Sequence, residues 1–220
     1  VQQHDMLKNQ RNIYHPFPIL LHRIIFEEVE ELNKDLFKFT KDLVNSDEII
    51  DAATDPEYNL TTQGASQPDI DLCKEYYGKV DCITKFVDDI MIPASQGWTE
   101  DHFMELSGKP MPTEGKLNFS TWTTYYTPNT WQTPHIHRDK LFTGVYYIKM
   151  PEQNGGEFVI QNPHLQSTQP FDGGWTVQKE MMPKEGELII IPSWLQHYPK
   201  PFSSGERCVI VFDAQYTLNT

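Results

Sequence analysis

Cysteine is scarce in this chain, and so is positive charge. The three cysteines, Cys73, Cys82 and Cys208, have no Cys-x-x-Cys spacing and are odd in number, which argues against a disulfide framework and favours a reducing compartment. Only 18 Lys and Arg stand against 31 Asp and Glu, giving a net charge of −13. Because this charge repels phosphate backbones and anionic lipid surfaces, nucleic acid and membranes are poor candidates as partners.

Long apolar runs are also missing. No run approaches the roughly 20 residues needed to span a bilayer, and the first residues, VQQHDMLKNQ, lack the basic-then-apolar pattern of a signal peptide. Glycine loops of the phosphate-binding type and Gly-x-Ser-x-Gly elbows are absent as well. We therefore expect a cytoplasmic protein that is neither a nucleotide-loop enzyme nor a serine hydrolase of that type.

The first half of the chain has the periodicity of supporting helices. Residues 13–25 combine two prolines with β-branched and aromatic residues, which predicts an edge strand. Apolar residues at three- and four-residue steps from Val29 to Leu43 predict an amphipathic helix. A second helix is expected over 69–92 and is predicted to end at Pro93. A further short helix is expected around 99–106.

The second half is rich in short strands separated by Pro and Gly turns. Strands are predicted over 118–126, 144–149, 156–160, 176–178, 187–191 and 207–212, which are rich in Thr, Val, Ile, Tyr and Trp. Such a pattern indicates a sandwich or jelly roll. We expect one integrated domain, mainly β with α, in which residues 1–115 support a β core of residues 116–220. The segment 161–184 is a candidate lid or substrate loop.

One stretch, Thr133 to Ile148 (TPHIHRDKLFTGVYYI), carries the candidate chemistry. His135, His137 and Asp139 follow one another at alternate positions, so in an extended chain their side chains point to one side. Two of them and a distant third ligand would make a facial metal site with open positions, the arrangement of non-haem iron(II) oxygenases. His197, between two strongly apolar runs, is the candidate third ligand.

Four motifs in order, HIHRDKLFTGVYYI, NGGEFVI, EGELIIIPSWLQH and GERCVIVF, resemble the 2-oxoglutarate- and iron(II)-dependent oxygenases. The likeness is to a branch of uncharacterised bacterial and phage proteins with the pattern His-x-His, five residues, Ser/Thr-Gly-Val-Tyr-Tyr. It implies a double-stranded β-helix, iron(II) as metal, 2-oxoglutarate and O2 as cosubstrates, and hydroxylation of a peptide or small molecule. A bacterial or virus-infected cytoplasm is implied as the location.

The resemblance also implies roles for individual residues. Iron(II) would be held by two upstream ligands and by His197, and the far carboxylate of 2-oxoglutarate would pair with Arg207. Alternation in RCVIVF places Arg207 on one face with two valines, where a guanidinium is costly unless a carboxylate meets it. Because Val209 stands where many relatives have Ser or Thr, another hydroxyl is needed, from Tyr125, Tyr126 or Tyr147.

Two questions stay open at this point. The upstream metal ligands are either His135 and His137, as the loop length favours, or His137 and Asp139, as the facial-triad chemistry favours. The function could also be that of a cupin-type metal dioxygenase without 2-oxoglutarate, or of a non-catalytic jelly-roll binding module. The acidic surface and the segment 161–184 are compatible with a substrate of neutral or basic character.

Overall fold

The computed structural model describes residues 19–47, 49–53, 62–112, 114–152, 155–163 and 177–218. Its helical elements are α1 (Glu30–Val44), α2 (Leu72–Tyr76), α3 (Asp81–Lys85), a π-helical stretch η1 (Phe86–Met91) and α4 (Ile92–Ser107). The strands are β1 (His22–Ile25), β2 (Thr62–Gln63), β3 (Gly115–Tyr126), β4 (Trp131–Gln132), β5 (Phe142–Lys149), β6 (Phe158–Gln161), β7 (Gln178–Met181), β8 (Glu187–Pro192), β9 (His197–Pro199) and β10 (Arg207–Leu218).

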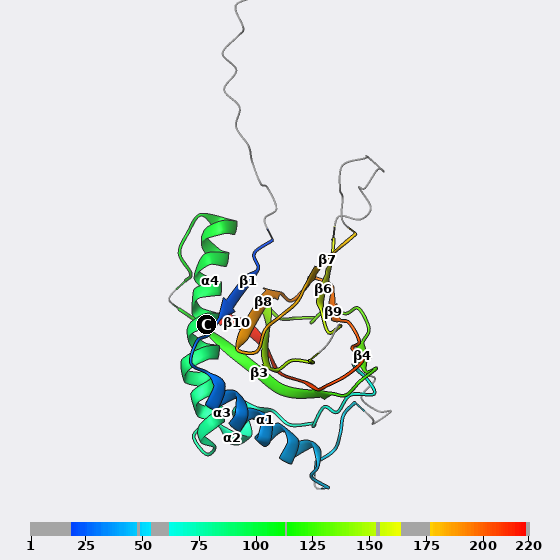
Figure 1. Ribbon diagram of the computed structural model, residues 1–220. Coiled ribbons are helices and arrows are strands. Elements are labelled where there is room, and N and C mark those ends of the chain that lie inside the picture. The colour runs from blue at the N-terminus through cyan, green and yellow to red at the C-terminus, as the bar shows by residue number, and fades with distance from the viewer. Residues whose placement is uncertain are drawn as a thin grey trace, which may run out of the picture.

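The strands form a jelly roll with a larger and a smaller antiparallel sheet. The larger sheet has the order β1-β8-β5-β10-β3, the smaller one the order β7-β6-β9, and β2 pairs with β4 at the side. Figure 1 shows the helices gathered on one side of the β structure, with β6, β7 and β9 on the opposite side. The predicted fold class, a mainly β jelly roll supported by N-terminal helices, is therefore confirmed.

Strand β10 lies between β5 and β3 in the larger sheet, and its two faces belong to two different cores. Its even-numbered residues Cys208, Ile210 and Phe212 belong to the core shared with the helices. Its odd-numbered residues Val209 and Val211 belong to a second core between the two sheets. This alternation follows from the two-residue period of a strand, and it means that the odd-numbered side chains of β10 face the interior of the jelly roll.

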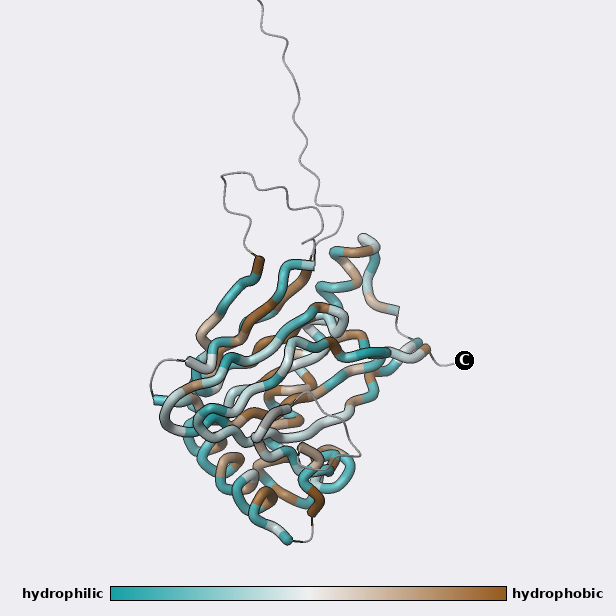
Figure 2. The backbone as a smooth tube through the Cα atoms, turned by 90° about the vertical axis from the view of Figure 1, so that its right-hand side faces the viewer, coloured by the Kyte–Doolittle hydropathy of each residue, from teal (hydrophilic) through white to brown (hydrophobic). Residues whose placement is uncertain are grey.

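The helices cover the outer face of the larger sheet with their apolar stripes. Helix α1 buries Leu36 and Leu43 there, and η1 and α4 bury Phe86 and Trp98. Figure 2 shows the helical segments at the bottom of the view alternating between hydrophilic and hydrophobic residues along the tube, as amphipathic helices do. Burial of this face fixes the larger sheet as a stiff support for the side chains on its inner face. None of the helices in the described ranges combines the length and hydropathy needed to cross a membrane.

The prediction that Pro93 ends the second helix is wrong. The predicted helix is divided into α2 and α3, and from α3 the chain continues through η1 into α4, where Pro93 stands at the start of the α-helical part. At the first turn of an α-helix the missing proline N–H costs little. In the π-helical turn before it, the backbone hydrogen bonds span five residues and not four. Pro93 therefore stands just after a change in the hydrogen-bond pattern, and the helix continues through it.

The predicted edge strand is present as β1, which pairs with β8 and is the outermost described strand at one side of the larger sheet. Residues 13–18 of the predicted span lie outside the described residues. Because β1 comes from the first half of the chain and β8 from the second, the two halves share one sheet. Strand β3 begins at Gly115, beside the expected boundary at 115/116, which itself stays a prediction.

Candidate metal centre

Three histidines come together at one end of the interior between the sheets. His135 and His137 lie on the segment after β4, and His197 opens β9. One ring nitrogen of each can be chosen so that all of these atoms lie within 4.8 Å of one another. The backbone fixes this meeting, because His135 and His197 exchange two N–H to C=O hydrogen bonds, both of 3.0 Å. The alternation of His135 and His137 along an extended segment thus directs both rings to His197.

The hydrogen bonds of the three rings decide which ring nitrogen of each histidine is directed to the space between the rings, where a metal ion would bind. Nδ1 of His135 lies 2.7 Å from the carbonyl oxygen of Thr133, and Nδ1 of His197 lies 2.9 Å from that of Leu195. A carbonyl oxygen only accepts hydrogen bonds, so each Nδ1 carries the proton and donates. The lone pair is then on Nε2, the tautomer that a metal ion requires.

Nδ1 of the third ring, that of His137, meets a carboxylate. It lies 2.8 Å from Oδ1 and 3.0 Å from Oδ2 of Asp213, a side chain that is buried. The Thr143 hydroxyl donates a further hydrogen bond to Asp213 Oδ1, so the carboxylate is held from two sides. A carboxylate behind a histidine orients the ring and makes its other nitrogen a stronger ligand.

Burial keeps His135 and His197 neutral. Desolvation lowers the pKa of His135 to about 4, against a smaller opposing effect of its hydrogen bond to Thr133. Desolvation lowers the pKa of His197 well below its ordinary value, and the nearby His135 and His137 lower it further. At neutral pH both imidazoles therefore present an unprotonated nitrogen to the space between the rings, which makes the cluster fit for a divalent cation.

Asp139, the alternative upstream ligand, lies apart from this cluster. Its side chain is exposed and its backbone has φ 62°, the left-handed region. The extended segment that carries His135 and His137 ends there, so the alternation no longer directs the next acidic side chain inward. The structure thus brings together His135, His137 and His197, and it leaves Asp139 at the surface.

Arg207 lies at the other end of the same cavity. Its side chain is fully buried, and Nη1 donates to the carbonyl oxygen of Lys200 at 3.2 Å. The guanidinium carbon lies 3.9 Å from the centre of the Tyr126 ring. Within the described residues, Nε and Nη2 have no hydrogen-bond partner. A buried cation with two unpaired donors is costly, and a carboxylate that accepts from both would remove the cost.

The tyrosines divide between the two faces of the sheet. Tyr147 lines the cavity with Arg207, and burial raises its pKa, so the phenol stays a neutral donor. Tyr125, predicted to act beside Arg207, lies elsewhere: its hydroxyl donates to Glu206, which also pairs with Lys41 at 2.8 Å. Tyr126 takes the inner position instead, because the residue paired directly with Arg207 across β3 and β10 is Tyr126.

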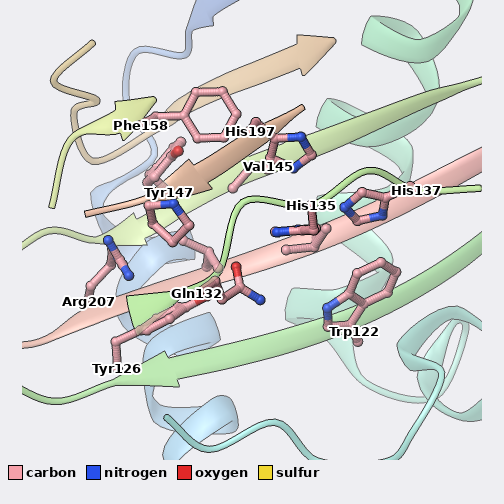
Figure 3. Close-up of a pocket in the computed structure, with 13 residues that line it drawn as sticks. Trp122, Tyr126, Gln132, His135, His137, Val145, Tyr147, Phe158, His197 and Arg207 are labelled. Atoms are coloured by element: carbon pink, nitrogen blue, oxygen red, sulfur yellow. The ribbon is translucent and has the colours of Figure 1, made fainter. Parts of the chain in front are cut away.

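The cavity connects the two groups of polar side chains. In Figure 3, Arg207 and Tyr126 lie at one end and His137 and Trp122 at the other, with His135 and Gln132 between them. Apolar side chains complete the walls, among them Val145, Phe158, Val209 and Val211. An elongated acid could therefore reach from the histidine cluster to the guanidinium, shielded from water on most sides.

Sequence reasoning missed one residue of this site, Asp213. A signal was present, because Asp213 continues the odd-numbered series of Arg207, Val209 and Val211 along β10. That series predicts an inward carboxylate once the strand is extended past Phe212. Its partner His137 is 76 residues away in the chain, so the pairing itself required the fold.

Comparison with known proteins supports the resemblance. A family model described as "Putative 2OG-Fe(II) oxygenase" matches residues 120–213, a range that includes the histidine cluster, Asp213 and Arg207. No curated protein matches the sequence. The expected resemblance to the 2-oxoglutarate- and iron(II)-dependent oxygenases is therefore confirmed, and so, at the level of the family, are iron(II), 2-oxoglutarate and O2 as cofactors. The likeness to one branch of these oxygenases stays a prediction.

Solved structures agree on the fold. A Trichoplax adhaerens prolyl hydroxylase in complex with a hypoxia inducible factor peptide fragment has a TM-score of 0.60 at 12% identity, covering 89% of this chain and 83% of that one. HygX from Streptomyces hygroscopicus, with nickel, 2-oxoglutarate and hygromycin B, has a TM-score of 0.56 at 11% identity, covering 90% and 82%. A viral collagen prolyl hydroxylase from Paramecium Bursaria Chlorella virus-1, as a 2-oxoglutarate complex, has 0.52 at 17% identity, covering 88% and 94%.

Proposed function

From its resemblance to the 2-oxoglutarate- and iron(II)-dependent oxygenases, we propose that this chain is a dioxygenase of that type that hydroxylates a peptide or small molecule. The observation that carries the proposal is the buried Arg207, whose two unpaired donors face the same cavity as the histidine cluster. A metal site alone would not need that cation. A site for a metal and a dicarboxylic acid needs both.

His135, His137 and His197 are the proposed iron ligands. Three imidazoles with one ring nitrogen each within 4.8 Å of the others fit a divalent transition metal, and the hydrogen bonds of His135 and His197 leave their Nε2 lone pairs free. The imidazoles contribute no negative charge, and Asp213 supplies a carboxylate that is hydrogen-bonded to the ring of His137. The geometry favours this set over one that includes Asp139, which is exposed and outside the cluster. When bound, iron(II) with 2-oxoglutarate and O2 supplies the oxidising chemistry.

Arg207 is the proposed anchor of the far carboxylate of 2-oxoglutarate. Its Nε and Nη2 are on one edge of the guanidinium and are both unpaired, the edge that binds a carboxylate through two parallel hydrogen bonds. The Tyr126 ring packs against the guanidinium face and limits its movement. Tyr147 is the proposed additional donor to the same carboxylate. The apolar walls keep water from competing for these groups.

A cupin-type dioxygenase without 2-oxoglutarate is the second candidate. The specific observation in its favour is that the cluster has three histidines and no carboxylate ligand. It leaves the buried Arg207 unexplained, because an oxygenase without a keto acid has no need of a carboxylate-binding cation in its cavity. A non-catalytic binding module explains neither the matched tautomers nor the guanidinium.

The deciding experiment compares wild type with Arg207→Met and His197→Ala. Iron(II) binding is measured by competition with a chromogenic chelator, and 2-oxoglutarate binding and its conversion to succinate are measured separately. We expect His197→Ala to lose iron binding and turnover. Arg207→Met should keep iron and lose 2-oxoglutarate binding by a factor of about 10 or more, the equivalent of about 1.4 kcal/mol.

The control is Lys109→Gln, at an exposed position beyond the end of α4, which should leave both properties unchanged. Circular dichroism checks that each variant is folded. Iron-dependent oxygen consumption with no use of 2-oxoglutarate would support the cupin-type reading. A folded wild-type protein with no affinity for iron would contradict both oxygenase readings.

A further inference from the structure

A second, open groove lies directly outside the histidine cluster. Its volume is about 600 Å³, and His135 belongs to its wall as well as to the inner cavity. The other wall residues come from three segments of the chain: Pro134, Ile136, Arg138, Gln161, Asn162, Pro163, Trp194 and Gln196. Because the groove and the cavity meet at His135, a molecule in the groove would lie beside the proposed metal.

Backbone hydrogen bonds tie these three segments together. His137 N–H donates to the carbonyl oxygen of Ser193 at 2.9 Å. Arg138 and Trp194 are the next residues after these two, so this hydrogen bond holds their backbones close together. Gln161 N–H donates to the carbonyl oxygen of Gln196 at 2.9 Å. The three segments that carry the wall residues are therefore joined by backbone hydrogen bonds.

The charge of this groove is opposite to that of the protein. The chain has a net charge of −13, yet among the groove residues that the structure describes there is no Asp or Glu, and Arg138 is the one charged side chain. Arg138 is exposed, and the described part of the chain offers it no ion pair or side-chain hydrogen bond. An anionic group entering the groove would find an unpaired guanidinium and no repelling carboxylate in the wall.

The groove also has an apolar side. Trp194 is 51% exposed and Ile136 is 42% exposed, and both line the groove, so together they give one part of its wall an apolar surface. An exposed indole offers a flat face for an apolar or ring-shaped body. The side-chain amides of Gln161 and Gln196 add donors and acceptors that suit an amide or peptide group.

We infer that the substrate is an organic acid with an apolar body, which lies on Trp194 and Ile136 while its carboxylate pairs with Arg138. This inference rests on the proposed function, because it makes the groove the place where the molecule to be hydroxylated binds. It replaces the expectation of a neutral or basic substrate, which was based on the acidic surface as a whole. The local charge at the site opposes that expectation.

Matched pairs of ligands test the inference. N-acetyl-L-phenylalanine, N-acetyl-L-leucine and N-acetyl-L-proline are each compared with the corresponding primary amide, which has the same body and no charge. Tetrapeptides with a free or an amidated C-terminus form a second series and separate a peptide from a small-molecule source of the carboxylate. Binding to the metal-free protein is measured by saturation-transfer NMR and calorimetry.

We expect acids to bind about fivefold more tightly than their amides, the scale of an exposed ion pair. Arg138→Gln should remove that preference, Arg138→Lys should keep part of it, and Trp194→Ala should weaken acid and amide equally. Lys109→Gln, which removes an equal charge far from the groove in sequence, should leave the preference intact. An excess of 2-oxoglutarate should not displace the acids, because it is proposed to bind at Arg207.

Equal binding of acids and amides, a preference that survives in Arg138→Gln, displacement by 2-oxoglutarate, or no binding in either series would each overturn the inference. The proposed function is tested separately by 2-oxoglutarate binding to the metal-loaded wild type. If the metal-loaded wild type does not bind 2-oxoglutarate but still prefers acids over amides, only the oxygenase proposal is rejected. If it binds 2-oxoglutarate but shows no preference for acids, only the groove assignment is rejected.

Discussion

Asp213 and His137 are joined by a hydrogen bond between buried side chains, with Nδ1 of the histidine 2.8 Å from the nearer carboxylate oxygen. We expect Asp213→Asn to weaken iron(II) binding by a factor of about 10 to 100, the usual cost of losing such a partner. The asparagine keeps the size of the side chain and removes its charge. Competition with a chelator measures the affinity, and an unchanged affinity in folded protein would show that the carboxylate has no influence on the metal.

A comparison of His135→Ala with Asp139→Ala decides between the two sets of upstream ligands. The structure places His135 in the cluster and Asp139 at the surface. We expect His135→Ala to lower iron affinity by at least about 100-fold, and Asp139→Ala to change it by less than about twofold. The same chelator assay reads both. The opposite pattern would establish His137, Asp139 and His197 as the metal ligands.

The sequence predicted candidates for those parts of the site that repeat along one segment. The alternate spacing selected His135, His137 and Asp139 without deciding between the two upstream pairs, and Arg207 was a candidate from its place in an apolar strand. The fold is what brings His135 and His137 to His197. The spacing could not rank Tyr125 against its neighbour Tyr126, because that depends on which residue of β3 pairs with Arg207.

Contacts between distant segments could not be predicted from the sequence either, because they also depend on which segments lie side by side in the fold. The pairing of Asp213 with His137 and the groove between Arg138 and Trp194 both arise where segments distant in the sequence meet. The jelly roll was predictable from many short strands, whereas the helix that continues past Pro93 was not. A proline at a first helical turn and one at a helix end look alike in a sequence without knowledge of the hydrogen bonds around them.

Thr124 is expected to take part in binding the cosubstrate. It pairs across the sheet with Val209, the position where the resemblance described above leads one to expect a hydroxyl residue. Its own hydroxyl is fully buried, without a hydrogen-bond partner in the described structure, and on the strand face of Tyr126 and Trp122. We expect Thr124→Val, which keeps the shape, to raise the KM for 2-oxoglutarate about fivefold. Thr124→Ser, which keeps the hydroxyl, should have the KM of wild type. An unchanged KM in both variants would exclude the role.

The stability of the metal-free protein should fall as the pH drops from about 6.5 to about 4. Burial lowers the pKa of His135 from 6.5 to about 4, so in this window the unfolded chain binds a proton that the folded chain does not. Stability then rises with pH, and the full difference for this group is about 3 kcal/mol. Above pH 6.5 both states are neutral and the effect disappears.

Urea unfolding between pH 4 and pH 7 measures that effect. His135→Asn should reduce the slope of stability against pH, and His197 should account for part of the slope that remains, because its pKa is also lowered by burial. Saturating zinc should steepen the loss at low pH, since protons compete with the metal for the same nitrogens. An equal slope in wild type and His135→Asn would show that this imidazole titrates normally in the folded protein.

Gly144, in the segment TGVYY, is expected to be required for packing and not for chemistry. It pairs directly with Phe212 across β5 and β10, and a Cβ at this position would lie 2.2 Å from the Phe212 ring. That ring is fully buried among the aromatic side chains beneath the helices. We expect Gly144→Ala to lower the free energy of unfolding by about 1 to 3 kcal/mol, measured by urea titration.

A double-mutant cycle identifies the cause of that loss. Phe212→Leu alone should be destabilising because it leaves a cavity, but in the presence of Gly144→Ala the smaller side chain should relieve the overlap, so the two costs should not add. Gly144 shares its strand face with Tyr146, in the core under the helices, whereas Tyr147 faces the cavity. Iron affinity of the folded Gly144→Ala protein should therefore equal that of wild type. Additive costs, or an affinity that falls with stability, would mean that the glycine acts on the metal centre itself.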